Sequence, residues 1–143
     1  NLYQRTVPHE GFRILQRWAE ARPRGCFVFT SNVDGQFQTA GFGQAVLECH
    51  GSIHQLQPLH PRDGSDLLNA SGFKLPEVDP QTLRLPAESV PRDATGSVLR
   101  PNILMFNDWG WDSSRTDRQE RHHGQWLRDL QASGRPAVVI RPA

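Results

Sequence analysis

Apolar residues recur at the spacing of an α-helix in two parts of the chain. The first pattern predicts a helix over residues 8–21, with Pro8 in its first turn and Pro23 just beyond its end. The second predicts a helix over residues 115–132, which Gly134 terminates. The residues of this second helix that we expect to face inward are Trp126, Leu127 and Leu130.

Short apolar runs predict strands beside these helices. Residues 26–29 are all apolar, which is typical of a strand buried on both faces of a parallel sheet. Residues 45–48 predict a second strand, and residues 137–140 predict another after the second helix. Residues 35–43 predict a glycine-containing turn or short helix. Helix–strand units at both ends of the chain indicate an α/β domain.

The middle of the chain has a different pattern. Residues 52–57 have Ile53 and Leu56 as their apolar members, whereas residues 58–96 are rich in Pro, Gly, Asp and Ser. A structureless loop of this length is uncommon in a compact domain, so we expect an inserted subdomain or a partly disordered flap. The predicted division is residues 1–50 in the α/β domain, 51–100 in the insertion, and 101–143 back in the α/β domain.

The amino-acid composition gives information on whether the chain binds nucleic acid or a membrane. The 143 residues include 16 Lys+Arg and 15 Asp+Glu, and the formal net charge of +1 gives no argument for nucleic acid or an anionic membrane. No apolar run approaches the roughly 18 residues of a membrane span, and no secretory signal pattern opens the chain. The sequence begins without Met and stops just after residues 137–140, so we expect a piece of a longer protein.

The cysteines and histidines do not form a metal-binding pattern. Cys26 and Cys49 are too few for a disulfide framework or a four-cysteine zinc site, and we expect two reduced, buried thiols in a cytoplasmic protein. His50, His54 and His60 lack the spacing of ligands on a helix, so no metal is predicted. The remaining neighbouring pair, which we expect to be solvated, is His122 and His123.

Polar residues follow the ends of the first two predicted strands. Residues 30–35 (TSNVDG) and 48–52 (ECHGS) are these segments. Ligand sites in open α/β sheets lie past the carboxyl ends of strands, so Asn32, Asp34 and His50 are expected to reach one pocket.

These residue types suit a defined chemistry. Asn32 and Asp34 offer hydrogen bonds to a ribose hydroxyl and a carboxamide, and the His50 imidazole could accept a proton from a hydroxyl. Glu48 is expected on the same strand face as His50 if the strand continues that far. The alternative is that Asn32 and Asp34 are turn formers and that His50 is an ordinary polar residue.

An aromatic segment precedes the second predicted helix. Trp109 and Trp111 flank Gly110, and they could wall an apolar channel or form core at a domain junction. Ser113 and Ser114 are expected to cap the helix that follows. The chain has no Gly-x-Ser-x-Gly elbow and no phosphate-binding glycine-rich loop.

In this order the motifs resemble those of the sirtuins, the NAD-dependent protein deacylases. The family's Thr-Gln-Asn-Ile-Asp-Gly corresponds to TSNVDG at residues 30–35, and its Glu-Leu-His-Gly-Ser to ECHGS at residues 48–52. Residues 99–108 (LRPNILMFND) stand where the family has Leu-Arg-Pro, apolar residues and a Phe-Gly-Glu-like end. The resemblance implies part of a Rossmann-like parallel sheet with flanking helices and an irregular small-domain insertion.

The resemblance also implies roles. Asn32 would bind the ribose next to nicotinamide, Asp34 would hold the nicotinamide carboxamide, and His50 would be the general base for the ribose hydroxyl. The acyl group would pass from lysine to ADP-ribose with release of nicotinamide, and Asn32 and His50 would be the catalytic residues. Ser31 would join the NAD contacts. An acyl-lysine protein or peptide would pair with a stretch made of Ile103, Leu104, Met105 and Phe106.

The chain departs from the family pattern in several places. Ser31 replaces the family's Gln, no cysteine follows Cys49 to build the family's structural zinc site, and residues 106–108 differ from Phe-Gly-Glu. The family's Gly-Ala-Gly loop and Gly-Thr-Ser motif, which hold the pyrophosphate and adenosine, are not in this sequence, so the isolated chain is expected to bind NAD poorly. An NAD glycohydrolase or ADP-ribosyltransferase on the same fold, or an inactive NAD- or ADP-ribose-binding module, remain alternatives, and no oligomeric state is predicted.

Overall fold

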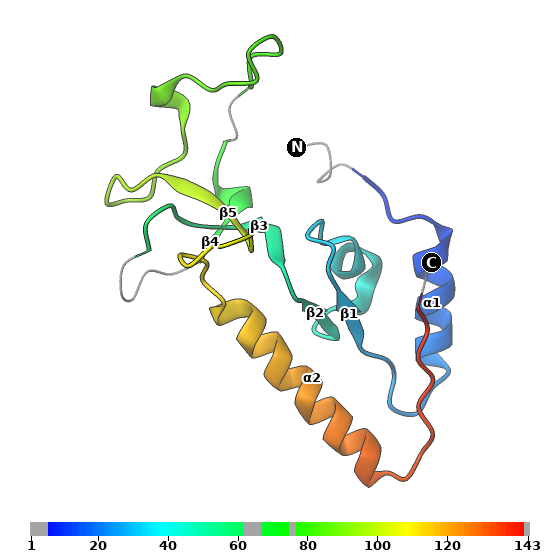
Figure 1. Ribbon diagram of the computed structural model, residues 1–143. Helices are drawn as coiled ribbons and strands as arrows, with labels where there is room; N and C mark the ends of the chain where they lie inside the picture. The colour runs from blue at the N-terminus through cyan, green and yellow to red at the C-terminus, as the bar shows by residue number, and fades with distance from the viewer. Residues whose placement is uncertain (1–5, 62–66, 75–76, 142–143) are drawn as a thin grey trace.

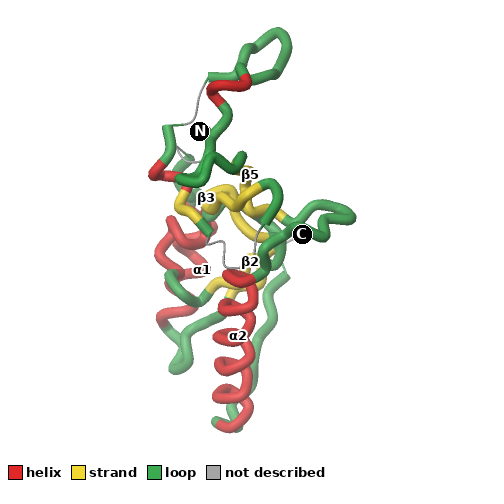
Figure 2. Tube along the Cα trace, turned by 90° about the vertical axis from the view of Figure 1, so that its left-hand side faces the viewer, coloured by secondary structure: helices red, strands yellow, loops and turns green. Residues whose placement is uncertain are grey.

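The computed structural model describes residues 6–61, 67–74 and 77–141 (Figure 1). Long irregular segments connect two small sheets and two α-helices, and α2 extends well past both sheets (Figures 1 and 2). The elements in chain order are α1 (Glu10–Glu20), β1 (Val28–Thr30), the short helical segment η2 (Gln38–Phe42), β2 (Val46–Glu48), β3 (Gly51–Pro58), β4 (Leu68–Asn69), the 3₁₀ turns η3 (Ala70–Gly72) and η4 (Ala87–Ser89), β5 (Leu99–Ile103) and α2 (Ser114–Ala132).

The first sheet is the parallel pair of β1 and β2. Val28 pairs with Val46, and the register ends with Thr30 opposite Glu48. All of β2 is buried, but Phe29 in β1 is 64% exposed. The expectation that the first strand is buried on both faces is therefore wrong, because the described part of the chain covers only one of its faces.

Helix α1 begins slightly later than its sequence pattern suggests. His9 is the N-cap residue, and its Nδ1 accepts a hydrogen bond from the Gly11 N–H at 3.1 Å. The ring of Phe12 packs edge-on against Phe37 at 4.9 Å, and Phe37 packs against Phe42 at 5.3 Å. The predicted helix and the predicted short helix over residues 35–43 are thus confirmed, and aromatic contacts join them.

Two aromatic side chains of α2 contact the segment that leads into β1. The indole N–H of Trp126 donates to the Arg24 carbonyl at 2.9 Å, and the Trp126 ring lies 6.0 Å from the ring of Phe27. His123 is half-buried with its ring 4.8 Å from Phe27, so the expectation that it is solvated is wrong. Leu127 is 46% exposed and does not face inward, because Trp126 and His123 define the covered face.

The start of α2 is held by Asp112 rather than by a serine hydroxyl. Ser113 occupies the N-cap position, but its Oγ donates to the Asp117 carboxylate at 3.0 Å. The Asp112 carboxylate accepts from the Ser114 N–H at 2.9 Å. Ser113 therefore takes the expected cap position without making the backbone hydrogen bond that defines a side-chain cap.

The second sheet is antiparallel, in the order β4–β3–β5. A small apolar core lies on it, formed by Leu56, Ala70 and Leu99 with Leu68 and Phe73 packed against it. These apolar side chains hold β4 and η3 against the sheet. Residues 77–90 extend away from both sheets, and Leu83 there is 78% exposed (Figures 1 and 2).

Residues 137–140 do not form the predicted strand. They follow α2 as an irregular segment, and Val138 and Val139 are 79% and 78% exposed. A strand requires a pairing partner, and the described part of the chain offers none to this segment. No helix among the described residues is long and apolar enough to cross a membrane.

Candidate functional site

The polar segments after β1 and β2 emerge at the same edge of the parallel pair. The Cys49 N–H donates to the Thr30 carbonyl at 3.0 Å, which extends the pairing of β1 and β2 by one step. Ser31, Asn32 and His50 are exposed just beyond this point, and Asp34 is half-buried. We call Ser31, Asn32, Asp34 and His50 the strand-end site. Sequence patterns alone placed its two segments beside each other correctly, because parallel neighbours end at one edge.

Local hydrogen bonds shape the chain from Asn32 to Gln36. The Asn32 N–H donates to Thr30 Oγ1 at 3.1 Å, and the Gln36 N–H donates to Asp34 Oδ1 at 3.0 Å. Asp34 is therefore a turn former, as the simpler alternative proposed. Turn formation uses one carboxylate oxygen, and no hydrogen bond to the other is found among the described residues.

Strand β3 holds the same turn from its other side. The Ile53 N–H donates to the Val33 carbonyl at 2.9 Å, and His54 Nε2 lies 2.9 Å from the Asp34 carbonyl oxygen. Sequence reasoning considered His54 only as a metal ligand and missed this contact. Its spacing from Asp34 along the chain gives no signal, because the contact depends on the path of β3.

Glu48 anchors the end of β2 to α2. Its side chain is 1% exposed and forms an ion pair with Arg115, while Gln119 Nε2 donates to the same carboxylate oxygen at 3.3 Å. The backbone of Glu48 is held as well: its N–H donates to Gln119 Oε1 at 3.0 Å, and Thr116 Oγ1 donates to its carbonyl at 3.1 Å. We call Glu48, Arg115, Thr116 and Gln119 the Glu48 anchor.

The Glu48 anchor corrects one expectation. Glu48 and His50 do not share a strand face, because β2 ends at Glu48 and the chain turns at the next two residues. Glu48 is buried against α2, whereas His50 is exposed. Glu48 therefore fixes the strand end from which His50 projects and does not act beside it.

The predicted substrate stretch starts next to His50. Ile103, the last residue of β5, pairs with Gly51, and the Leu104 N–H donates to the His50 carbonyl at 3.0 Å. Met105 and Phe106 are 60% and 101% exposed. The structure therefore brings the stretch from Ile103 to Phe106 beside one member of the strand-end site.

The loop after this stretch is braced although its aromatic side chain is exposed. Arg100 donates two hydrogen bonds to Asp108, at 2.7 and 2.9 Å, and these bonds hold the pKa of the Asp108 carboxyl below its usual value. Trp109 is 97% exposed, so it neither walls a channel nor forms core. Trp111 is half-buried.

Buried amides connect β3, β5 and the loop before α2. Gln57 and Asn102 are both 0% exposed, and Asn102 Nδ2 donates to Gln57 Oε1 at 2.8 Å and to the Asp112 carbonyl at 2.8 Å. Gln57 Nε2 donates to the Gly110 carbonyl at 2.6 Å, and Gln57 Oε1 accepts from the Asp112 N–H at 3.1 Å. We call Gln57 and Asn102 the amide pair. Sequence reasoning missed both residues, because polar residues in a strand pattern are normally assigned to the solvent face.

The two cysteines are half-buried free thiols near β1 and β2. Burial raises the pKa of Cys26 and of Cys49 above the ordinary thiol value. A raised pKa lowers the fraction of reactive thiolate at neutral pH.

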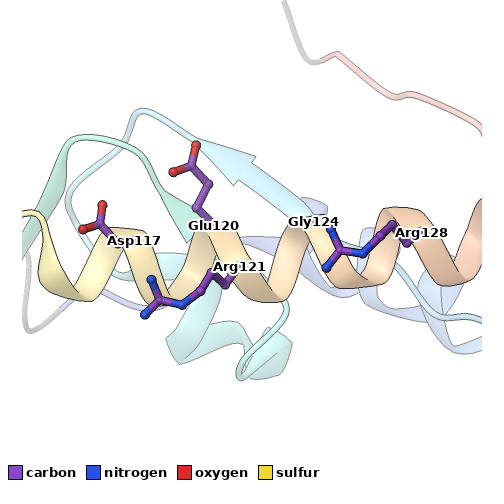
Figure 3. Close-up of a pocket in the computed structure, with 5 residues that line it drawn as sticks. All are labelled: Asp117, Glu120, Arg121, Gly124 and Arg128. Carbon is purple, nitrogen blue, oxygen red and sulfur yellow. The ribbon is translucent and has the colours of Figure 1, made fainter.

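A shallow cavity of about 390 Å³ lies along α2 (Figure 3). Its lining comes from successive turns of the helix: Asp117, Glu120, Arg121, Gly124 and Arg128. Two acidic residues at one end of it are followed by two arginines, and none of the predicted site residues takes part.

Comparisons with known proteins identify the fold. No protein-family model matches the chain. A curated protein named NAD-dependent protein deacetylase, from Cutibacterium acnes (strain DSM 16379 / KPA171202), is 30% identical over 101 residues. The structure matches a Sir2–p53 peptide–NAD⁺ complex with a TM-score of 0.56 and 20% identity, and Sir2Tm bound to a propionylated peptide with the same two values. The chain has the sirtuin fold.

The resemblance to the sirtuins and the expected α/β, Rossmann-like class are both confirmed. The matches cover only part of each relative. The aligned residues make up 71% of this chain and 35% of the curated deacetylase, and the two solved structures match over 87% of this chain and 45–46% of theirs. This chain therefore spans less than half the length of these sirtuin relatives.

Proposed function

We propose that the protein is a sirtuin-like NAD-dependent protein lysine deacylase, which transfers an acyl group to ADP-ribose and releases nicotinamide. One observation carries the proposal. The turn at His50 joins the strand-end site to the exposed stretch that begins at Ile103, through the hydrogen bond from the Leu104 N–H to the His50 carbonyl. Residues suited to a nucleotide and a segment suited to a peptide thus meet at one point.

The relatives' names support this assignment. The curated relative is named an NAD-dependent protein deacetylase, and the solved relatives include complexes with NAD⁺ and a p53 peptide and with a propionylated peptide. These ligands belong to those proteins. They are of the same two kinds as the ligands proposed here, a nucleotide at the strand-end site and a peptide at the neighbouring stretch.

The residues of the strand-end site fit the nicotinamide end of NAD chemically. A carboxamide N–H needs an acceptor, which the second Asp34 carboxylate oxygen supplies. A ribose hydroxyl both donates and accepts, as does the exposed Asn32 amide. When bound, NAD supplies the ribose–nicotinamide bond whose cleavage makes the ribose carbon electrophilic.

His50 is proposed as the general base. An imidazole titrates near neutral pH and can take a proton from a hydroxyl without a metal ion. Its ring is exposed, while its backbone is held by the Leu104 N–H and by the preceding Glu48 anchor. Ser31 has a shorter side chain than the family's Gln, so we propose a reduced ribose contact at this position.

Ile103, Leu104, Met105 and Phe106 are proposed to hold the acyl-lysine peptide. β5 is an edge strand of the antiparallel sheet, and an extended peptide can add to such an edge through backbone hydrogen bonds. The exposed side chains of Met105 and Phe106 then provide apolar contact.

Nicotinamide release from NAD, measured in the complete protein with and without an acetyl-lysine peptide, tests the proposal. We expect release that depends on the peptide. Release at the same rate without peptide would instead indicate an NAD glycohydrolase, and binding of NAD with no release would indicate a binding module.

A further inference from the structure

His54 is a half-buried histidine in β3 that belongs to neither sirtuin motif of this chain. Its Nε2 lies 2.9 Å from the Asp34 carbonyl oxygen. A carbonyl oxygen can only accept a hydrogen bond, so Nε2 must carry the proton and donate. The contact therefore selects the Nε2–H tautomer and links β3 to the backbone of Asp34.

The His54 ring fills the space that Gly35 leaves open. Gly35 has a φ of 69°, which side chains rarely adopt. A Cβ built on Gly35 would lie 2.6 Å from His54 Cδ2 and 2.8 Å from Nε2. Gly35 is thus needed both for the backbone turn and for the close approach of the ring, and the ring covers the turn directly after Asp34.

The path of β3 explains why His54 reaches this turn. The register between β3 and β5 shifts between Ser52 and Leu56, so the residues between them do not follow the regular pairing with β5. Ile53 donates instead to the Val33 carbonyl, and the His54 N–H donates to Ser52 Oγ at 3.3 Å. The irregularity directs this part of β3 toward the segment after β1.

We propose that His54 is a positioning residue for NAD, and this inference rests on the proposed function. His54 fixes the Asp34 carbonyl, and the Gln36 N–H fixes Asp34 Oδ1, so the backbone and the side chain of Asp34 are held from two directions. The second carboxylate oxygen then has a set direction toward the nicotinamide carboxamide. Loss of the His54 hydrogen bond frees the turn and weakens binding of NAD, and it leaves the peptide contacts at Ile103 to Phe106 intact.

Three substitutions separate the hydrogen bond from the bulk of the ring. His54→Phe keeps a ring without the donor, and His54→Gln keeps an N–H donor of similar reach. His54→Asn keeps the amide on a side chain one carbon shorter, so it serves if His54→Phe does not fold. His60→Ala, at an exposed histidine, is the matched control.

Calorimetric titration of NAD into the complete protein is the first measurement. We expect His54→Phe and His54→Asn to raise the Kd for NAD about tenfold, which corresponds to roughly 1.4 kcal/mol and is the scale of one lost hydrogen bond. His54→Gln should stay within about threefold of the wild type, and His60→Ala should not change the Kd. The KM for the acyl-lysine peptide should be unaltered in all four variants.

NMR of the ¹⁵N-labelled complete protein adds a readout that is independent of activity, and it should show His54 as the Nε2–H tautomer. Equal NAD affinity in wild type and His54→Phe, or a Nδ1–H tautomer, would overturn the inference. A parallel rise in the peptide KM would also overturn it, because it would indicate a general structural role. If the wild type neither binds NAD nor releases nicotinamide, the proposed function itself is wrong. If the wild type binds NAD and releases nicotinamide and the His54 variants do the same, only the role of His54 is wrong.

Discussion

The end of β2 and the antiparallel sheet are held in different ways. The Glu48 anchor fixes the strand end through a buried ion pair between Glu48 and Arg115. The antiparallel sheet has a small apolar core and the neutral amide pair, Gln57 and Asn102. Both regions border the candidate site, and both depend on buried polar contacts. The comparison indicates that specific buried polar contacts, more than buried apolar area, hold the regions that border the candidate site.

The two kinds of contact differ in what happens when one partner is lost. A buried carboxylate without its cation keeps a charge in a medium that solvates it poorly, whereas an unpaired amide loses only dipolar contacts. The strand-end region should therefore be more sensitive to single substitutions than the antiparallel sheet. The following predictions test this difference, from the largest expected effect to the smallest.

His50→Ala should have the largest effect, and it should affect chemistry and not stability. We expect peptide-dependent nicotinamide release to fall by about two to four orders of magnitude, the scale of losing a general base. The side chain is exposed and only the backbone carbonyl bonds to Leu104, so the melting temperature should stay unchanged. Unaltered release would remove His50 from the mechanism, and a large loss of stability would show that its ring supports the fold.

Arg115→Ala should cause the largest loss of stability. It leaves the Glu48 carboxylate buried without its cation, and such changes cost about 3–5 kcal/mol. Urea unfolding of the variant measures this loss. Arg118→Ala is the matched control, because Arg118 is exposed on the same helix and its loss should change the free energy of unfolding by less than about 0.5 kcal/mol. Equal effects of the two substitutions would show that the ion pair contributes nothing specific.

Asn102→Ala should destabilise the protein less, by about 1–3 kcal/mol, because it leaves the Asp112 carbonyl without one donor and creates a small cavity.

The double substitution Gln57→Leu with Asn102→Leu tests whether the two members of the amide pair depend on each other. Replacing both partners with apolar groups can be nearly neutral, so the double variant should be more stable than the sum of the two single effects predicts. Simple additivity in chemical denaturation would contradict coupling within the amide pair.

The parts of this structure that the sequence predicted are those that depend on local patterns. The two helices, the two parallel strands and the shared edge of residues 30–35 and 48–52 follow from periodicity and from the geometry of parallel sheets. The error at residues 137–140 has a physical reason. An apolar run shows which residues favour burial, but it does not show which strand will pair with them.

The contacts that position the site could not be read from the sequence. Glu48 and Arg115 are 67 residues apart, and no local spacing connects them. Leu127 was expected to face inward because it is apolar, but Arg115 and Gln119 show that the contacting face of α2 is partly polar. His54 reaches Asp34 through an irregularity in β3 that no residue type signals. Long-range polar pairing and strand irregularity were therefore the missing information.

Asp108→Asn should give the smallest effect, and one that depends on pH. The two hydrogen bonds from Arg100 hold the pKa of Asp108 below the value of about 3.9 for an unfolded chain. A lowered folded-state pKa means that the contribution to stability is complete above the unfolded pKa and is lost as pH falls through the folded pKa. At pH 7 the variant should be less stable than wild type by about 1–2 kcal/mol, since the pair is largely shielded from solvent, with exposures of 18% and 13%.

Unfolding curves at neutral pH and near pH 3 check this expectation. The difference between wild type and Asp108→Asn should shrink at the lower pH, whereas Glu88→Gln, at an exposed carboxylate, should show little difference at either pH. A gap that stays constant with pH would mean that the shape of the Asp108 side chain, and not its charge, braces the loop that carries Trp109. In that case charge would contribute to stability only at the Glu48 anchor. The two regions would then differ more in how they are held than their contacts alone indicate.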